Sequence, residues 1–218
     1  MKVIILAAGQ GYQLDGFNKL LIKHPADGKR IIDRYLGAFS GKEVTFVVGY
    51  RAINVMHNYP HLDYVYNDSW GVTNNSYSLS LAIGDEPCYV VSGDLLFDSE
   101  LISELDSAAP NLIVTQMRDN RTLSAINVTV NEKKIINEAY QGKLRSENHP
   151  EAVGIFKISD PRLLTAWKRN CIEYGNLFVG QNIPFETEVD IVSHDSSNYK
   201  IDEVNTVMDY MRLLEVKY

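Results

Sequence analysis

A glycine-rich turn followed by a lysine is the first part of this sequence that could do chemistry. Gly9 and Gly11 come directly after the apolar run 3–7, and Lys19 follows a short distance along the chain. Glycine allows φ > 0, so a loop can bring several backbone N–H groups close to one point. Such a concave set of N–H donors suits phosphate oxygens, and a lysine adds a mobile positive charge. We therefore predict a phosphate site formed by Gly9, Gly11 and Lys19.

Two familiar phosphate loops do not match this turn. A P-loop needs Ser or Thr after its lysine, but Leu20 follows Lys19. The dinucleotide fingerprint G-x-G-x-x-G needs a third glycine at the position that Leu14 occupies. The alternative is a plain glycine-rich turn between a strand and a loop, which leaves Lys19 unexplained.

The segment 66–79 is dense in amide and hydroxyl side chains. One of them, Thr73 or Asn74, is accounted for as the N-cap of a helix. Amides and hydroxyls both donate and accept hydrogen bonds, which suits the uncharged edge of a nucleobase. A polar helix start of this kind, facing a cleft, suits the recognition of a base.

An acidic side chain follows a second strand-like run, at Gly93-Asp94. Ligands of open α/β sheets gather outside the carboxyl ends of the strands. A carboxylate there suits Mg²⁺, which prefers oxygen ligands and phosphate partners. We predict Asp94 as a metal ligand with Gly93 beside the bound ligand, and the alternative is an ordinary turn aspartate. A second acid, Asp202, precedes the last helix and could be only its N-cap.

The elements that must position these residues alternate along the first half of the chain. Strands are expected at 3–7, 44–48, 63–66, 89–91 and 112–115, and helices at 30–39, 51–59, 74–82 and 99–105. This order favours a mostly parallel sheet with helices on both faces. The second half predicts a hairpin (125–130 and 133–137), strands at 153–158 and 188–192, and helices at 161–174 and 202–216. Asp160 and Pro161 suit the cap and first turn of the helix 161–174.

We therefore expect one α/β domain over residues 1–218, with a Rossmann-like mixed, mostly parallel sheet and a small β-rich insertion. The formal net charge of -7 argues against a broad nucleic-acid surface, which needs clustered Lys and Arg. No apolar run approaches the ~18 residues of a membrane span. Cys88 and Cys171 lie among apolar neighbours, as buried thiols of a reducing compartment do. We expect a cytoplasmic protein, and its composition leaves room for a small anionic ligand held by a few basic groups.

Residues 6–11, together with Lys19-Leu20-Leu21, resemble the nucleotidyltransferases that activate sugar phosphates and phospho-alcohols. The resemblance implies a nucleotide-diphospho-sugar transferase type of fold, with Lys19 steadying the charge of a bound nucleoside triphosphate. It implies that the triphosphate is wrapped by the following residues: Leu6, Ala7, Ala8, Gly9, Gln10 and Gly11.

The chain departs from the family signature L-A-A-G-x-G-x-R at Gln13, which stands where the family has arginine. A charge-assisted hydrogen bond to phosphate is about twice as strong as a neutral one. Either Lys23, Lys29 or Arg30 replaces the missing cation, or turnover is slow, or the protein no longer catalyses.

The pattern Asn-Asn-x-x-Ser at 74–78, after Tyr66-Asn67, resembles the choline-phosphate and phosphonate cytidylyltransferase branch. This resemblance implies that Asn74, Asn75 and Ser78 contact the nucleotide and that the nucleotide is CTP. The segment from Ile201 to Asp209 is similar to the family's closing "I-D-x-x-x-D", which implies that Asp202 joins Asp94 on Mg²⁺. The family builds its second-substrate pocket in the region 140–155. There Lys143 or Arg145 would meet the phosphate of an acceptor and Glu151 its amine, and a solvated loop of mixed charge is the alternative.

The resulting hypothesis is a cytidylyltransferase that moves CMP from CTP to phosphocholine, 2-aminoethylphosphonate or a similar acceptor, with release of pyrophosphate. Its catalytic residues would be Lys19, Asp94 and Asp202, and Gln13 would adjoin the nucleotide. Two alternatives are a sugar-1-phosphate nucleotidyltransferase that uses another NTP and a nucleotide-binding protein with weakened catalysis.

Overall fold

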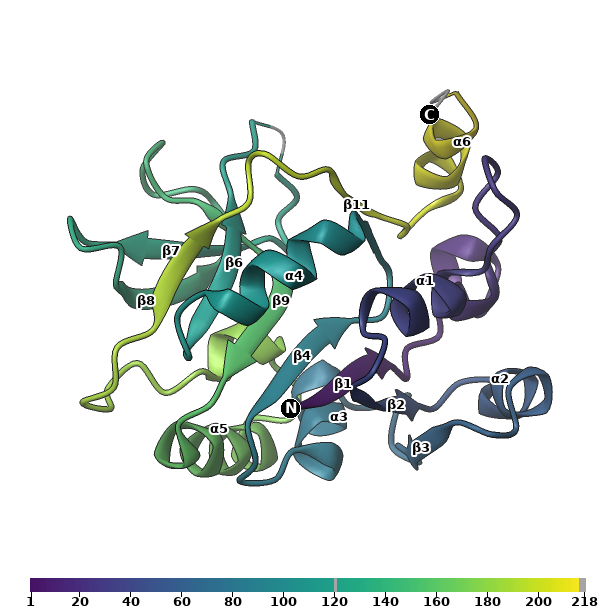
Figure 1. The fold of residues 1–218 in the computed structure, drawn as a ribbon, viewed down its shortest axis with the longest axis horizontal. Helices are drawn as coiled ribbons and strands as arrows, with labels where there is room; N and C mark the ends of the chain where they lie inside the picture. The colour runs from purple at the N-terminus through teal and green to yellow at the C-terminus, as the bar shows by residue number, and fades with distance from the viewer. Residues whose placement is uncertain (120, 216–218) are drawn as a thin grey trace.

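A mixed sheet runs through the computed structural model of the chain, which describes residues 1–119 and 121–215 (Figure 1). The strands follow the order β10–β6–β9–β4–β1–β2–β3, and a β7–β8 hairpin is attached to β9. Along this order neighbours are parallel except at β9, which is antiparallel to β4 and β6 and also to β7. The two strands of the β7–β8 hairpin are antiparallel as well. The strands are β1 Lys2–Ala7, β2 Glu43–Val48, β3 Asp63–Tyr66, β4 Cys88–Ser92, β6 Leu112–Gln116, β7 Ile126–Val130, β8 Ile136–Gln141, β9 Glu151–Ile158 and β10 Val192–Asp195. The predicted mostly parallel sheet with a β-rich insertion is confirmed.

Helices cover both faces of this sheet. Alternate side chains of β1 enter two cores, with Val3 and Ile5 in one and Ile4 and Leu6 in the other. The first core is covered by α1 Ile31–Ala38, α2 Ala52–Asn58 and α4 Ser99–Ser107. The second is covered by α3 Asn75–Ala82 and α5 Pro161–Glu173. Burial on both faces explains why β1 is an unbroken apolar run.

Two expected elements of the second half are corrected by the structure. No strand forms at 188–191, because the pairing with β6 begins only at Val192, opposite Leu112. The last helix, α6 Val207–Glu215, does not start at Asp202, because β11 Ile201–Glu203 pairs with the unexpected strand β5 Leu95–Phe97. Val216, the expected end of that helix, lies outside the described residues.

The first turn of α6 is fixed by two side chains that cap each other's backbone. Thr206 Oγ1 accepts from Asp209 N at 3.1 Å, and Asp209 Oδ2 accepts from Thr206 N at 2.7 Å. The same Asp209 oxygen accepts from Asn205 N at 3.0 Å. Among the described residues, no helix is long and apolar enough to cross a bilayer.

The side chain that caps α5, Asp160, should make the stability of the protein depend on pH. Asp160 accepts hydrogen bonds from Arg162 N at 2.8 Å and from its guanidinium, and the side-chain bond holds the pKa of Asp160 at about 2, below its ordinary 3.8. A carboxylate with a depressed pKa stabilises the fold above its unfolded pKa and loses that contribution as the pH falls through its folded pKa. Asp160→Asn keeps a capping oxygen but has no charge to lose. The difference in free energy of unfolding between wild type and this variant should therefore be constant above about pH 4 and shrink toward pH 2. Urea titrations across this range measure it, and parallel curves would contradict the assignment.

Candidate active site

A cavity of about 290 Å³ opens where the neighbouring strands β1 and β4 end. Leu6 pairs with Ser92, so the turns after the two strands emerge side by side. Of the predicted nucleotide-binding residues, the cavity is lined by Leu6, Ala7, Ala8, Gly9, Gly11, Lys19, Asn74, Asn75, Ser78 and Gly93. Asp94 also lines it, as do Asn18, Asn67, Trp70, Thr73, Ser92, Phe178 and Asn205, which were not predicted as site residues.

Two glycines allow the walls to come this close. A Cβ on Gly93 would stand 2.7 Å from Leu6 O and 2.7 Å from Ala7 Cβ, so only glycine fits between the two turns. Gly11 has φ 57°, and a Cβ there would stand 3.2 Å from Phe17 O and 3.6 Å from Lys19 Cε. The loop can therefore turn back on itself and carry Lys19 into the cavity.

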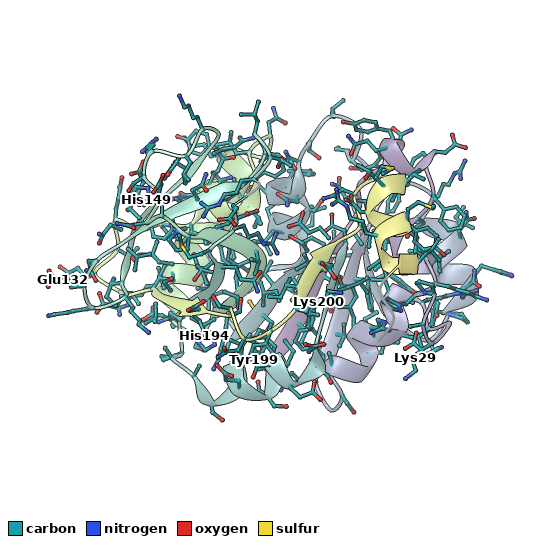
Figure 2. The ribbon with its side chains drawn as sticks, turned by 90° about the horizontal axis from the view of Figure 1, so that it is seen from above. Lys29, Glu132, His149, His194, Tyr199 and Lys200 are labelled. Atoms are coloured by element: carbon teal, nitrogen blue, oxygen red, sulfur yellow. The ribbon has the colours of Figure 1, made fainter. Side chains whose placement is uncertain are left out.

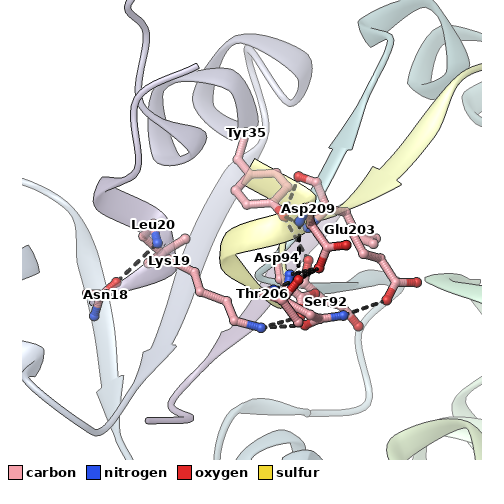
Figure 3. A network of polar contacts seen from close by, with 11 residues as sticks. Asn18, Lys19, Leu20, Tyr35, Ser92, Asp94, Glu203, Thr206 and Asp209 are labelled. Carbon is pink, nitrogen blue, oxygen red and sulfur yellow. Dashed lines mark hydrogen bonds and ion pairs between the residues drawn. The ribbon is translucent and has the colours of Figure 1, made fainter. Parts of the chain in front are cut away.

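Side chains from three separate segments of the chain, Lys19, Asp94 and Asn205, come together in the cavity, with the ammonium of Lys19 between the other two (Figure 3). Lys19 Nζ donates to Asp94 Oδ2 at 2.9 Å and to Asn205 Oδ1 at 2.5 Å. Lys19 begins a short 3-10 turn (Lys19–Leu21) that Asn18 caps by accepting from Leu20 N at 3.1 Å. The side chains of Lys19 and Asp94 are 22% and 24% exposed, so the pair is reachable from solvent.

The turn that carries Asp94 is held from behind by Tyr35 of α1. Its hydroxyl lies 2.8 Å from Ser92 O and 3.0 Å from Leu95 O, to which it can donate, and it accepts from Leu95 N at 2.9 Å. Burial, with the nearby Asp94 charge, raises the pKa of Tyr35 well above its ordinary value, so the hydroxyl keeps its proton. Val204 N donates to Asp94 O at 2.9 Å and joins the C-terminal segment to the same turn.

Another part of the cavity wall carries no charged side chain and is held by amide groups. Asn67 is buried, and its side chain donates to Ser78 Oγ at 3.0 Å and accepts from Ser69 N at 2.9 Å. Asn74 caps α3, and Asn75 Oδ1 accepts from Val179 N at 2.8 Å. This wall is preorganised by its own hydrogen bonds and offers polar groups without charge. Asn67 belongs to the Tyr66-Asn67 motif, but only its contacts in the structure show that it holds this wall in place.

The structure does not bring Asp202 to Asp94. Its carboxylate lies 3.2 Å from Lys200 Nζ, and the residue does not line the cavity. Neighbouring side chains of a strand point to opposite faces, and in β11 it is Glu203 that contacts Asn205, at 2.9 Å. Of the predicted pair, Asp94 lines the cavity and Asp202 does not, whereas Asn205 does.

A profile of the MobA-like NTP transferase domain matches residues 3–172 of this chain. The chain belongs to the MobA-like NTP transferase family. It is thus an enzyme of the nucleotidyltransferase class. Two of its cavity residues, Phe178 and Asn205, come after the matched segment.

Solved structures with the same fold confirm the architecture of this transferase. The CTP:phosphocholine cytidylyltransferase from Streptococcus pneumoniae is similar over 98% of this chain and 97% of its own, with a TM-score of 0.76 and 19% identity. The inositol-1-phosphate CTP transferase from T. maritima is similar over 98% of this chain and 95% of its own, with a TM-score of 0.75 and 18% identity. A putative glucose-1-phosphate thymidylyltransferase from Bacillus anthracis is similar over 100% of this chain and 97% of its own, with a TM-score of 0.73 and 16% identity. No curated protein sequence matches the chain.

None of the residues considered as replacements for the missing arginine places a positive charge in the cavity of the transferase. Gln10 and Gln13 are exposed and do not line it. Lys23 and Lys29 are exposed as well, and Lys29 lies on the outer edge of the molecule (Figure 2). Arg30 donates to Asn58 Oδ1 at 2.9 Å. Within the described part of the chain, Lys19 is the one basic side chain of the cavity wall.

Of the three residues predicted for the acceptor, Glu151 alone lies in a polar cluster next to the cavity. It is 7% exposed, with its oxygens 3.7 Å from Arg118 Nη1 and 3.9 Å from Arg121 Nε. Burial raises the pKa of Glu151, and the two guanidinium groups oppose that shift. Lys143 and Arg145 are exposed, and Arg145 pairs with Glu138 at 2.8 Å.

Arg118 links this cluster to the cavity. Its Nη1 donates to Glu203 Oε1 at 3.3 Å, and Glu203 Oε2 accepts from Asn205 Nδ2 at 2.9 Å. Burial and the Asp94 charge raise the pKa of Glu203, and Arg118 opposes them. Arg118 and Arg121 were not predicted as site residues, although both lie in the segment that follows β6, at the end of the strand where ligands gather.

Proposed function

We propose that this transferase moves CMP from CTP to a small phosphate- or phosphonate-bearing acceptor and releases pyrophosphate. The observation that carries the proposal is the meeting of Lys19, Asp94 and Asn205 beside a glycine-rich turn and an uncharged amide wall. Two of the similar structures have names that specify CTP, which supports cytidine as the base.

In this reaction an acceptor oxygen attacks the α-phosphorus of CTP, and the bond from that phosphorus to the oxygen bridging to the β-phosphorus breaks. The electron pair stays with the departing pyrophosphate. Lys19 and the N–H groups around Gly9 and Gly11 stabilise the charge on the phosphates, and a preorganised site of this kind supplies most of the rate enhancement by position and electrostatics. The amide wall around Asn74, Asn75 and Ser78 holds the uncharged base.

The residues present suit a magnesium ion at Asp94 and Asn205. Their oxygens already contact a common cation, the Lys19 ammonium, and carboxylate and amide oxygens are hard donors of the kind that Mg²⁺ prefers. Within the described residues, no three His, Cys, Asp or Glu side chains form a metal cluster, so water and phosphates would supply the other ligands. Such an ion neutralises phosphate charge. Asn205 takes the place first predicted for Asp202.

The acceptor is assigned to the side of the cavity next to Arg118, Arg121 and Glu151. The guanidinium groups are suited to a phosphate or phosphonate, and the Glu151 carboxylate is suited to an amine. This cluster favours an acceptor that carries both groups, such as phosphocholine or 2-aminoethylphosphonate. Lys143 and Arg145 are exposed and are proposed only as outer contacts.

The second candidate function is nucleotide binding with weakened catalysis. Gln13 is exposed where the family signature has arginine, and Lys19 stands without a second basic side chain in the described cavity wall. A protein of this kind would bind CTP with Mg²⁺ but release no pyrophosphate with any acceptor, and Gln13→Arg would raise the rate.

Pyrophosphate release with each of the four NTPs tests the proposal. Phosphocholine, 2-aminoethylphosphonate and glucose 1-phosphate serve as acceptors, and Asp94→Asn is the inactive control. We expect the highest kcat/KM with CTP and an amine-bearing acceptor. Faster release from another NTP with glucose 1-phosphate would show a sugar-phosphate transferase instead.

A further inference from the structure

We propose that Glu203 is a positioning residue that sets which way the Asn205 side-chain amide faces, so that its oxygen points at the cation position of the cavity. This inference rests on the proposed function, in which Asn205 Oδ1 and Asp94 hold Mg²⁺. Glu203 itself does not line the cavity and would act only through Asn205.

The backbone of Asn205 is already fixed by other contacts. Asn205 N donates to Asp209 Oδ2 at 3.0 Å, and the preceding residue, Val204, donates to Asp94 O at 2.9 Å. With the backbone of both residues held, the terminal amide of Asn205 can still rotate without moving the chain. That torsion is broad and roughly two-fold, so a flip exchanges oxygen and nitrogen in nearly the same space.

The neighbours of the amide make its two orientations very different in energy. In the observed orientation Oδ1 accepts from Lys19 Nζ at 2.5 Å, and Nδ2 donates to Glu203 Oε2 at 2.9 Å. A flip would aim N–H groups at the ammonium and the carbonyl oxygen at the carboxylate, and both contacts would be repulsive. When a metal replaces the ammonium as the cation, Glu203 continues to select the orientation that offers oxygen.

Glu203 is itself held in place by Arg118. Arg118 donates to Glu203 Oε1 at 3.3 Å and, with its other terminal nitrogen, to Ile201 O at 3.0 Å. The carboxylate therefore has one oxygen for Arg118 and one for Asn205. In Glu203→Gln the single remaining oxygen goes to the guanidinium, and the new N–H₂ group faces Asn205. That isosteric change should turn the Asn205 amide around and present nitrogen to the metal.

The experiment is a Mn²⁺ titration followed by the electron paramagnetic resonance signal of the free ion. Glu203→Gln is compared with wild type, and the same pair is repeated in an Asn205→Asp background. A carboxylate has two equivalent oxygens and needs no orientation. Glu132→Gln is the matched control, because it removes the same charge from an exposed turn at the far edge of the molecule (Figure 2).

We expect Glu203→Gln to weaken Mn²⁺ binding about tenfold or more in the wild-type background, as the loss of an outer-shell partner does. In the Asn205→Asp background the same change should leave binding unchanged or strengthen it, because it removes repulsion between two carboxylates. Equal weakening in both backgrounds would overturn the inference and show that Glu203 acts by charge alone. Unchanged Mn²⁺ affinity with a raised KM for the acceptor would overturn it in favour of a direct acceptor contact. If Asp94→Asn binds Mn²⁺ as well as wild type does, the proposed metal site itself fails, and this inference fails with it.

Discussion

Replacing Lys19 with methionine should lower kcat/KM for pyrophosphate release by about two to three orders of magnitude, the range for loss of one preorganised charge-stabilising group. Lys19 is the one basic side chain in the described cavity wall, so none of the other described wall residues can take over its charge. The side chains of Lys19 and Asp94 are partly exposed, at 22% and 24%, so losing their ion pair should cost at most about 1 kcal/mol of stability. The variant should therefore fold normally and fail in turnover.

The matched control for Lys19 is Lys23→Met, which removes an exposed lysine from the same loop region. Its kcat/KM should equal that of wild type within about a factor of two, since surface substitutions away from a site have small effects. Steady-state kinetics and urea midpoints on both variants complete the comparison. A large loss in Lys23→Met with little loss in Lys19→Met would mean that the loop rearranges to bring Lys23 to the phosphates.

Gly93→Ala should damage both stability and nucleotide binding. The added Cβ would stand 2.7 Å from Leu6 O and from Ala7 Cβ, and these atoms belong to the end of β1 and cannot swing aside. Overpacking of this kind typically costs about 1–3 kcal/mol, occasionally more. The two turns that form the cavity floor must also move apart, so the affinity for CTP should fall together with the urea midpoint.

The control for this change is Gly37→Ala in α1, where a Cβ would meet nothing within 4 Å. Alanine there should stabilise the protein by up to about 1 kcal/mol, because glycine is a poor residue in a helix interior. Urea denaturation and a CTP titration measure both effects. If Gly93→Ala matches wild type in midpoint and affinity, the close approach of the two turns has no importance for the site.

The sequence indicated those parts of the site that depend on short-range patterns. The apolar run of β1, the turn with Gly9 and Gly11, and the capped start of α3 at Asn74 are each recognisable within a few residues. Parallel neighbours then bring their carboxyl ends together, which is why the structure places Asp94 beside that turn.

The part of the site that sequence analysis missed depends on pairing between distant segments. The choice between Asp202 and Asn205 turns on β11, which pairs with β5, a three-residue strand that carries no clear pattern of its own. That pairing fixes which side chains of the C-terminal segment face the cavity. Arg118 is likewise connected to the cavity only through its contact with Glu203, which lies far away in the sequence. Such contacts cannot be inferred from the periodicity of either segment alone.

The capped first turn of α6 determines how firmly one wall of the cavity is held. Leu213 is the one buried side chain among those described in this helix, and Val207 and Met208 are exposed. Segments with few buried apolar contacts open locally at low free-energy cost. Fraying of this turn would release Asn205 from Asp209 while the central strands keep Asp94 and the glycine turn in place. The cavity thus combines a rigid floor with one wall that can yield, and the proposed affinity for Mg²⁺ would depend on the helicity of a peripheral segment.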